Sequence, residues 1–311
     1  MAKTKTTANG TASSSPTEEN NHTEPKVRLD VQKTYKLYIG GKFPRTESGR
    51  FYKAESPEGK LIANLCQASR KDFRDAVVAA RNAQPGWEGR SAYNRGQILY
   101  RMAEMLEGRK PQFVAELKAL GQTDADATRE VEHAIDRLVY YAGWSDKYSQ
   151  VFSAVNPVDS SHFNFSAPEP MGVISVFAPE KPGLLGLISS IIPAVAGGNT
   201  VVVLASNAAP TAAISFAEVL QTSDLPGGVI NILTGFRKEL LSHFSSHKDV
   251  NAMIYCGTDP AEIAGIRERA AENLKRVIVW GREEWYSPES QGPYFIMDTQ
   301  EIKTTWHPVG Q

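Results

Sequence analysis

The feature that most constrains the fold is a regular alternation of apolar runs and helix-like segments from Val173 onward. The apolar runs lie at 173–177, 200–204, 229–233, 252–255 and 276–279. The helix-like segments between them lie at 185–196, 211–220, 238–247 and 260–273. Continuous apolar strands that alternate with helices form a parallel sheet covered on both faces. The pattern therefore predicts an α/β fold.

The same alternation predicts where a ligand would bind. Ligands of open parallel sheets bind beyond the carboxyl ends of the strands. The loops that follow the first four strands are therefore the candidate site, at 178–183, 205–210, 234–237 and 256–260.

The chain before the sheet divides into a polar tail and a helical part. Residues 1–25 carry almost no large apolar side chains, so we expect them to be disordered. The region 26–150 combines an N-terminal arm with helices. One helix follows Ser69, with Asp72 completing part of a capping box. A second follows Ser91 and ends near Gly108 and Pro111, and a third runs to Trp144.

Four further segments read as strands or connectors. Alternating apolar residues predict hairpins at 33–43, with its turn at Gly40–Gly41, and at 151–170. Residues 282–299 are rich in turn-forming residues and predict a connector. The end of the chain, 300–311, reads as a single strand that needs a sheet to join.

Bulk composition excludes several classes of protein. The 311 residues carry a net charge of −1, so we expect no binding to nucleic acid or membranes. Two distant cysteines form neither a disulfide framework nor a metal-binding pair, and the N-terminus lacks a signal peptide's apolar core. These features favour a cytoplasmic protein.

Several motifs, in a fixed order, resemble the aldehyde dehydrogenase superfamily. They are YIGGKF, DFRDAVVAARNAQPGW, RGQILYRMAEMLE, YYAGWSDKY, EPMGVISVFAP, IIPAVAGGNTVVV, LPGGVINILTGF, NLKRVIV and, near the end, EIKTT. The resemblance implies a Rossmann-like NAD(P)-binding domain, here at 171–281. It also implies a small strand module for oligomerisation, similar to 33–43, 151–170 and 300–311. The family's catalytic domain and its cysteine nucleophile have no counterpart, because the connector takes their place.

Two positions that the family uses for catalysis also differ. Lys181 stands where the family has the asparagine that helps to hold the oxyanion, and lysine offers a mobile charge instead of a fixed amide. Trp280 stands where the family has its glutamate general base, and an indole accepts no proton. The resemblance therefore implies that the catalytic groups are missing.

The family's cofactor contacts are also altered. Leu204 and Asn207 occupy the positions of a lysine and a glutamate that hold the adenosine ribose, although Asn207 keeps one neutral hydrogen bond. Thr258 keeps the hydroxyl of the pyrophosphate loop. Asp259, however, is expected at the helix N-cap, where its carboxylate repels phosphate, and Glu262 adds a second charge.

We therefore expect no cofactor, with weak NAD or NADP binding as the alternative. The residual contacts would come from family-matched loop residues: Pro179, Ser206, Asn207, Gly257 and Thr258.

Other reactive side chains have simpler interpretations. Cys256 lies at a strand end and is a weak candidate for a replacement nucleophile, because no histidine lies near it in sequence. His243 and His247 share a helix face but lack a third ligand, so we expect no metal site. Glu283 and Glu284 are interpreted as surface charges of the connector.

These observations favour a non-catalytic subunit that pairs with a full-length aldehyde dehydrogenase and stabilises or regulates it. The exposed strands of the oligomerisation module would make that contact, and self-association is a further expectation. One alternative is an NAD(P)-dependent aldehyde oxidoreductase that uses Cys256 or residues from a partner. Another is a cofactor-binding regulator without chemistry.

Overall fold

A five-stranded parallel sheet, ordered β10-β9-β6-β7-β8, forms the centre of the computed structural model, which describes residues 31–310. Its strands are β6 (Val173–Phe177), β7 (Thr200–Leu204), β8 (Ile230–Leu233), β9 (Ala252–Tyr255) and β10 (Arg276–Val279). The predicted α/β fold with a Rossmann-like sheet is confirmed. The expected disordered tail at 1–25 lies outside the described residues.

Helices cover both faces of this sheet because both faces are apolar. Each crossover between the strands contains one helix: α6 (Gly183–Ala196), α7 (Pro210–Gln221), α8 (Arg237–Ser246) and α9 (Pro260–Ala271). Alternate strand residues point to opposite faces. Val201, Val203 and Ile232 pack with α6 and α7, whereas Val202 and Phe177 pack with α8.

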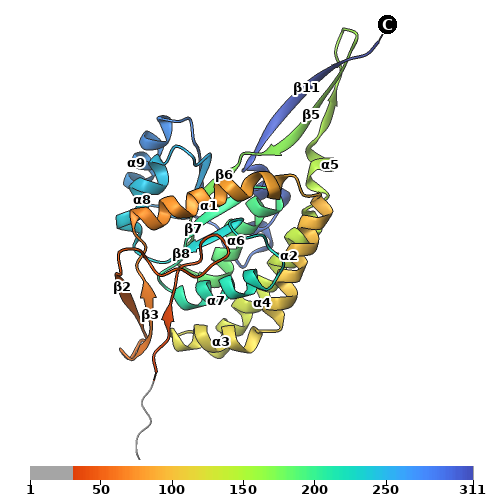
Figure 1. Ribbon diagram of the computed structural model, residues 1–311. Helices are drawn as coiled ribbons and strands as arrows, with labels where there is room; N and C mark the ends of the chain where they lie inside the picture. The colour runs from red at the N-terminus through yellow and green to blue at the C-terminus, as the bar shows by residue number, and fades with distance from the viewer. Residues whose placement is uncertain (1–30, 311) are drawn as a thin grey trace, which may run out of the picture. The chain divides into compact units, whose positions relative to one another are not determined.

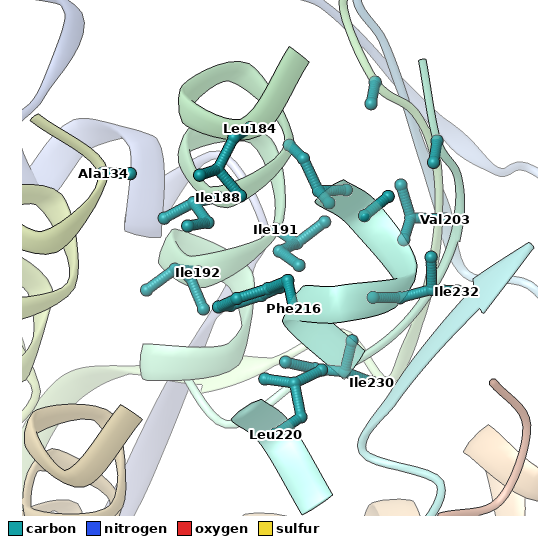
Figure 2. Close-up of a cluster of buried hydrophobic side chains, with 14 of the residues drawn as sticks. Ala134, Leu184, Ile188, Ile191, Ile192, Val203, Phe216, Leu220, Ile230 and Ile232 are labelled. Carbon is teal, nitrogen blue, oxygen red and sulfur yellow. The ribbon is translucent and has the colours of Figure 1, made fainter. Parts of the chain in front are cut away.

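The larger of two clusters of buried apolar side chains lies between the sheet and an outer helical layer. Figure 2 shows side chains of α6 and α7, among them Ile191, Ile192 and Phe216, packed between Ala134 on one side and Val203 on the other. The outer helices are α1 (Arg70–Glu88), α2 (Ala92–Glu107), α3 (Lys110–Ala119), α4 (Asp124–Trp144) and the short α5 (Tyr148–Phe152). Of these, α1 lies on the α8 face (Figure 1).

The helix signals read from the sequence are confirmed at their starts. Ser69 and Asp72 form a complete capping box on α1, and the Ser91 side chain accepts from Asn94 N at the start of α2. The predicted end of the second helix is confirmed too, because α2 stops at Glu107 with Gly108 as its C-cap residue. Pro111 then lies in the first turn of α3, where a missing N–H costs nothing.

The hairpin predicted at 33–43 has a different role from the one that the resemblance implied. Gly40 and Gly41 do form its turn, with φ of 62° and 77°. However, β1 (Thr34–Tyr35) pairs with β3 (Leu61–Cys66), and Tyr38 bridges to Ile232 at the edge of the main sheet. This segment therefore belongs to the sheet domain and not to the oligomerisation strands. The antiparallel partner of β3, β2 (Phe51–Glu55), was not predicted either.

A separate three-stranded sheet, which we call the arm, is built from the other two predicted strand segments. It is ordered β11-β5-β4 and consists of β4 (Ala154–Asn156), β5 (His162–Pro170) and β11 (Gln300–Pro308). Figure 1 shows β5 and β11 side by side, leading away from the main sheet. The connector between β10 and β11 contains a 3-10 turn at Pro288–Ser290 and α10 (Pro293–Met297).

Within residues 31–310, no helix is long and apolar enough to cross a membrane.

Candidate functional site at the strand ends

Four loops meet at the carboxyl edge of the main sheet, as the alternation predicted. Backbone hydrogen bonds join neighbouring strand ends, with Cys256 N donating to Phe177 O at 3.1 Å and Trp280 N donating to Tyr255 O at 3.1 Å. Ser206 and Cys256 are buried there, whereas Asn207 and Thr258 are exposed. The residues predicted from sequence therefore do lie at one edge.

A glutamate joins the loops that follow β6 and β7. The Glu180 carboxylate accepts from Asn207 N at 2.9 Å and from Ser206 Oγ at 3.1 Å, and Ser206 Oγ also donates to Glu180 O at 2.7 Å. The predicted cofactor contacts Ser206 and Asn207 are thus engaged by a side chain of the protein itself.

An arginine lies between two carboxylates at the same edge. Arg237 opens α8, and its guanidinium nitrogens lie 3.8 Å from Glu180 Oε1 and 3.9 Å from Glu262 Oε2. Its guanidinium also lies over the rings of Phe177 and Tyr255, at 5.8 and 5.3 Å from their centroids. This position ties the α8 N-terminus to the loops after β6 and β9.

Tyr255 completes the group that we call the strand-end cluster: Glu180, Arg237, Tyr255 and Glu262. The Tyr255 hydroxyl donates to the Glu262 carboxylate and lies 3.5 Å from Arg237 Nη1. Burial, with a further contribution from Glu262, raises the pKa of Tyr255 to about 12. A Cβ added at Gly257 would lie 2.5 Å from the Tyr255 hydroxyl. The ring therefore lies directly against the loop that matches the family's pyrophosphate loop.

The start of α9 has the cap that the sequence predicted. Asp259 is the N-cap residue, its Oδ1 accepts from Ala261 N at 2.9 Å, and Pro260 is the first helical residue. The carboxylate therefore satisfies one of the free N–H groups of the first turn. A helix N-terminus can hold an anion only where such groups stay available.

Trp280 serves as a packing residue. It is buried, its Nε1 donates to Asp298 Oδ2 at 3.0 Å, and its ring meets Phe295 edge-on at 4.9 Å between centroids. Because Asp298 is shielded from solvent, its pKa is raised. The family's base position is thus used to dock the connector against the end of β10.

Cys256 is also enclosed. Its side chain is 7% exposed, and burial raises the pKa of its thiol strongly, which opposes formation of the reactive thiolate. Arg237 acts in the opposite direction, as a smaller effect than burial.

Lys181 lies beside a cavity of about 490 Å³ between the start of α6, the start of α4 and the connector. Glu283 and Glu284, interpreted from sequence as ordinary surface charges, line the same cavity. At its wall the buried Glu130 carboxylate accepts from Leu184 N at 2.6 Å and Leu185 N at 3.2 Å. A larger hollow of about 940 Å³ lies between α2 and α4 and contains none of the predicted site residues.

Metal-ligating side chains do not gather in the part of the chain that the structure describes. There, no group of three or more His, Cys, Asp and Glu side chains lies close enough to hold an ion. His247 packs edge-on against Phe73 at 5.7 Å between centroids, and its Nδ1 accepts from Asp249 N at 3.3 Å.

Comparison with known proteins identifies the family of this fold and strand-end arrangement. Residues 43–280 match the family model described as "Aldehyde dehydrogenase family". The chain belongs to the aldehyde dehydrogenase family.

Relatives within the family are similar over most of this chain. It is 32% identical over 261 residues to "Putative aldehyde dehydrogenase DhaS" of Bacillus subtilis, covering 82% of this chain and 52% of that protein. It is also 32% identical over 264 residues to "Retinal dehydrogenase 2" of Gallus gallus, with 82% and 50% covered. The chain therefore spans about half the length of the curated relatives that it matches.

A solved structure that is more than 25% identical aligns with the fold. The crystal structure of PnpE, from Pseudomonas sp. WBC-3, in complex with nicotinamide adenine dinucleotide is 27% identical. It superposes with a TM-score of 0.75 and covers 79% of this chain and 50% of PnpE. One solved structure of similar architecture was thus determined with NAD.

The residues of this family member fit a dinucleotide poorly. Glu180, Glu262 and Asp259 place three carboxylates at the strand ends against the single guanidinium of Arg237. At an effective dielectric constant of about 20, two like unit charges about 5 Å apart repel by about 3 kcal/mol. A pyrophosphate near these loops would face that repulsion more than once.

Sequence analysis did not identify Glu180, Arg237 or Tyr255 as site residues. Glu180 lies in the loop after the first predicted strand, in VFAPE, and Arg237 lies at the end of the loop after the third, in LTGFR. Tyr255 is the last residue of the fourth predicted strand, AMIY. The usable signal was the charge of Glu180 and Arg237 in two loops that a parallel sheet brings to one edge.

Proposed function

We propose that this chain is a non-catalytic member of the aldehyde dehydrogenase family that pairs with a full-length aldehyde dehydrogenase and stabilises or regulates it. The observation that carries this proposal is the strand-end cluster. It engages the loops after β6, β8 and β9 with internal ion pairs and hydrogen bonds, so the protein's own side chains take up the groups that would contact a cofactor.

The reactive groups support the same proposal. Trp280 holds the connector, Lys181 offers no fixed amide donor, and the Cys256 thiol is buried with a raised pKa. Among the described residues at the strand ends, these positions therefore do not place an activated nucleophile beside a general base.

The arm supplies the surface for a partner. On one face, Val155 is 67% exposed and Phe163 is 45% exposed, and with Phe165 they line a hollow of about 350 Å³. Exposed apolar side chains grouped on a sheet face are typical of protein–protein contacts. We propose that this face, defined here as the apolar arm face, contacts the enzyme.

Co-expression tests the partnership. A tagged form of this chain should co-purify with a full-length aldehyde dehydrogenase from the same organism. Phe163→Ser combined with Val155→Ser should reduce recovery of the enzyme at least tenfold. The matched control is Val78→Ser on α1, because the exposure of Val78, at 50%, lies between those of Val155 and Phe163. The proposal would be contradicted if the arm variant recovered as much enzyme as the wild-type chain does. It would also be contradicted if the wild-type chain recovered no enzyme.

The NAD-bound relative favours a second candidate function, an NAD(P)-dependent aldehyde oxidoreductase with a reduced or partner-completed site. Calorimetry with millimolar NAD and NADP separates the candidates. We expect no heat, because of the carboxylates at the strand ends. Binding with aldehyde turnover that Cys256→Ala abolishes would establish the oxidoreductase. Binding without turnover would indicate a cofactor-binding regulator that uses Pro179, Gly257 and Thr258 with the residues after β7.

A further inference from the structure

One side of β11 faces no other strand in the part of the chain that the structure describes. In the arm, β11 is the edge strand and pairs only with β5, over the full length from Gln300 to Pro308 (Figure 1). A free edge of this length is a template for another strand, because its backbone donors and acceptors are unpaired.

The alternation of the β5–β11 ladder identifies which residues form the free edge. Met171 N donates to Thr299 O at one end, and Val309 N donates to Ser161 O at the other. Antiparallel strands alternate in the side to which their backbone groups point. Odd-numbered residues of β11 therefore bond to β5, while Ile302, Thr304 and Trp306 direct their N–H and C=O groups outward.

At the Gln300 end of this edge, the outward-facing groups already have a partner. The Gln300 carbonyl accepts from Arg276 Nη1 at 2.7 Å, and Glu301 pairs with Arg276 Nη2 at 2.8 Å. The open stretch therefore runs from Ile302 toward Pro308, and its backbone groups are centred on Thr304.

We propose that a second copy of this chain docks here through antiparallel β11–β11 pairing about a two-fold axis at Thr304. In this register each outward-facing residue meets another: Thr304 pairs with its own copy, and Ile302 pairs with the second copy's Trp306. Backbone hydrogen bonds then form at all three residues of each strand.

The side chains of β11 complement one another in the same register. Ile302 and Trp306 are 53% and 58% exposed, and each meets the other across the junction as an apolar cross-strand pair. On the opposite face Glu301 meets the second copy's His307, and Lys303 meets Thr305. No like charges stand opposite each other.

Other registers match less well. A centre at Thr305 pairs Trp306 with the second copy's Thr304, and a centre at Lys303 pairs Ile302 with Thr304, so neither brings Ile302 and Trp306 together. A centre at Trp306 stacks the indole on its own copy and leaves Ile302 beyond the strand. A centre at Ile302 leaves Trp306 without a partner. Only the Thr304 register pairs both large apolar residues.

This docking leaves the apolar arm face free. Phe163 pairs with His307 and Phe165 with Thr305, so both phenylalanines lie on the odd-numbered face, opposite Ile302 and Trp306. The self-pairing proposal is therefore independent of the proposed contact with an enzyme, and the purified chain alone tests it.

The decisive variant is Thr304→Pro. Proline is tolerated on an edge strand where its missing N–H faces outward, so the β5 ladder stays intact while the centre of the junction is blocked. Sedimentation should give the wild-type chain twice the 34.1 kDa mass of one copy. Thr304→Pro should raise the dimer dissociation constant at least tenfold, with an unchanged circular dichroism spectrum. Phe163→Ser, on the opposite face, should leave the dimer unchanged.

A nitroxide label tests the register directly. Thr304→Cys places two labels beside the two-fold axis, so dimerisation should broaden the spectrum by dipolar coupling, while the buried Cys66 and Cys256 stay unlabelled. A monomeric wild-type chain, a Thr304→Pro dimer of wild-type affinity, or a dimer without broadening would each overturn the proposal.

Discussion

At the scale of single residues, the clearest effect of this fold is a buried guanidinium held by neutral oxygen acceptors. Arg137 is 3% exposed, and it donates to Ser189 Oγ and Ser290 O at 2.7 Å and to Trp285 O at 2.9 Å. Desolvation lowers its pKa, so the three acceptors offset part of the cost of burying the charge. Arg137 thereby fixes the connector to α4 and α6.

Arg137→Met should lower the free energy of unfolding by about 3 kcal/mol, because buried carbonyls lose their donors at about 1–3 kcal/mol each. Urea denaturation measures the change, and hydrogen exchange should show faster opening near Trp285 and Ser290. Arg129→Met is the matched control on the same helix, since Arg129 is exposed and only lies over the Tyr286 ring, 4.3 Å from its centroid. Equal effects of both variants would contradict the anchoring role.

A second residue-scale prediction concerns Tyr255, whose pKa is raised from 10.0 to about 12 in the folded chain. Below pH 10 the phenol is neutral in both states, and its interactions contribute fully to the stability of the folded chain. Between pH 10 and 12 the phenol ionises in the unfolded chain but not in the folded chain, so this contribution to stability is lost. The stability difference between the wild-type chain and Tyr255→Phe should therefore shrink from pH 9 to pH 11. Urea denaturation at both pH values measures it, and a constant difference would show that Tyr255 does not titrate as described.

At the scale of elements, α6 depends on a cap from another helix. Its N-cap residue, Pro182, offers no side-chain acceptor, and the Glu130 carboxylate of α4 bonds Leu184 N and Leu185 N instead. Gln122 Nε2 donates to the same carboxylate at 2.6 Å.

Glu130→Ala should therefore destabilise the protein by about 2–4 kcal/mol, because two buried N–H groups lose their acceptor. The control is Asp126→Ala, one turn earlier on α4, where the residue is exposed and its backbone N–H is already capped by Thr123. Chemical denaturation of both variants gives the comparison. A loss below about 0.5 kcal/mol for Glu130→Ala would be the size of an ordinary surface substitution and would exclude this capping role.

At the scale of the whole molecule, the connector makes the chain from Gln32 onward a single unit. Trp285 and Ile296 are buried against the helices, and the Asn199 amide donates to Thr299 O at 3.1 Å. We expect the tryptophan fluorescence and far-ultraviolet circular dichroism transitions in urea to coincide, because loosening the connector exposes the sheet's helical layer. Two separated transitions would mean that the connector folds independently.

The sequence by itself determined the main sheet, the capped helix starts and the arm strands, because each depends on local periodicity or on a cap a few residues away. It also placed Asp259 at the start of α9. Only the tertiary structure decided the strand-end cluster, the packing role of Trp280 and the place of the 33–43 hairpin at the sheet edge. These features join residues far apart in the chain, such as Glu180 with Arg237, and the pattern along the sequence carries no information about which distant charges meet.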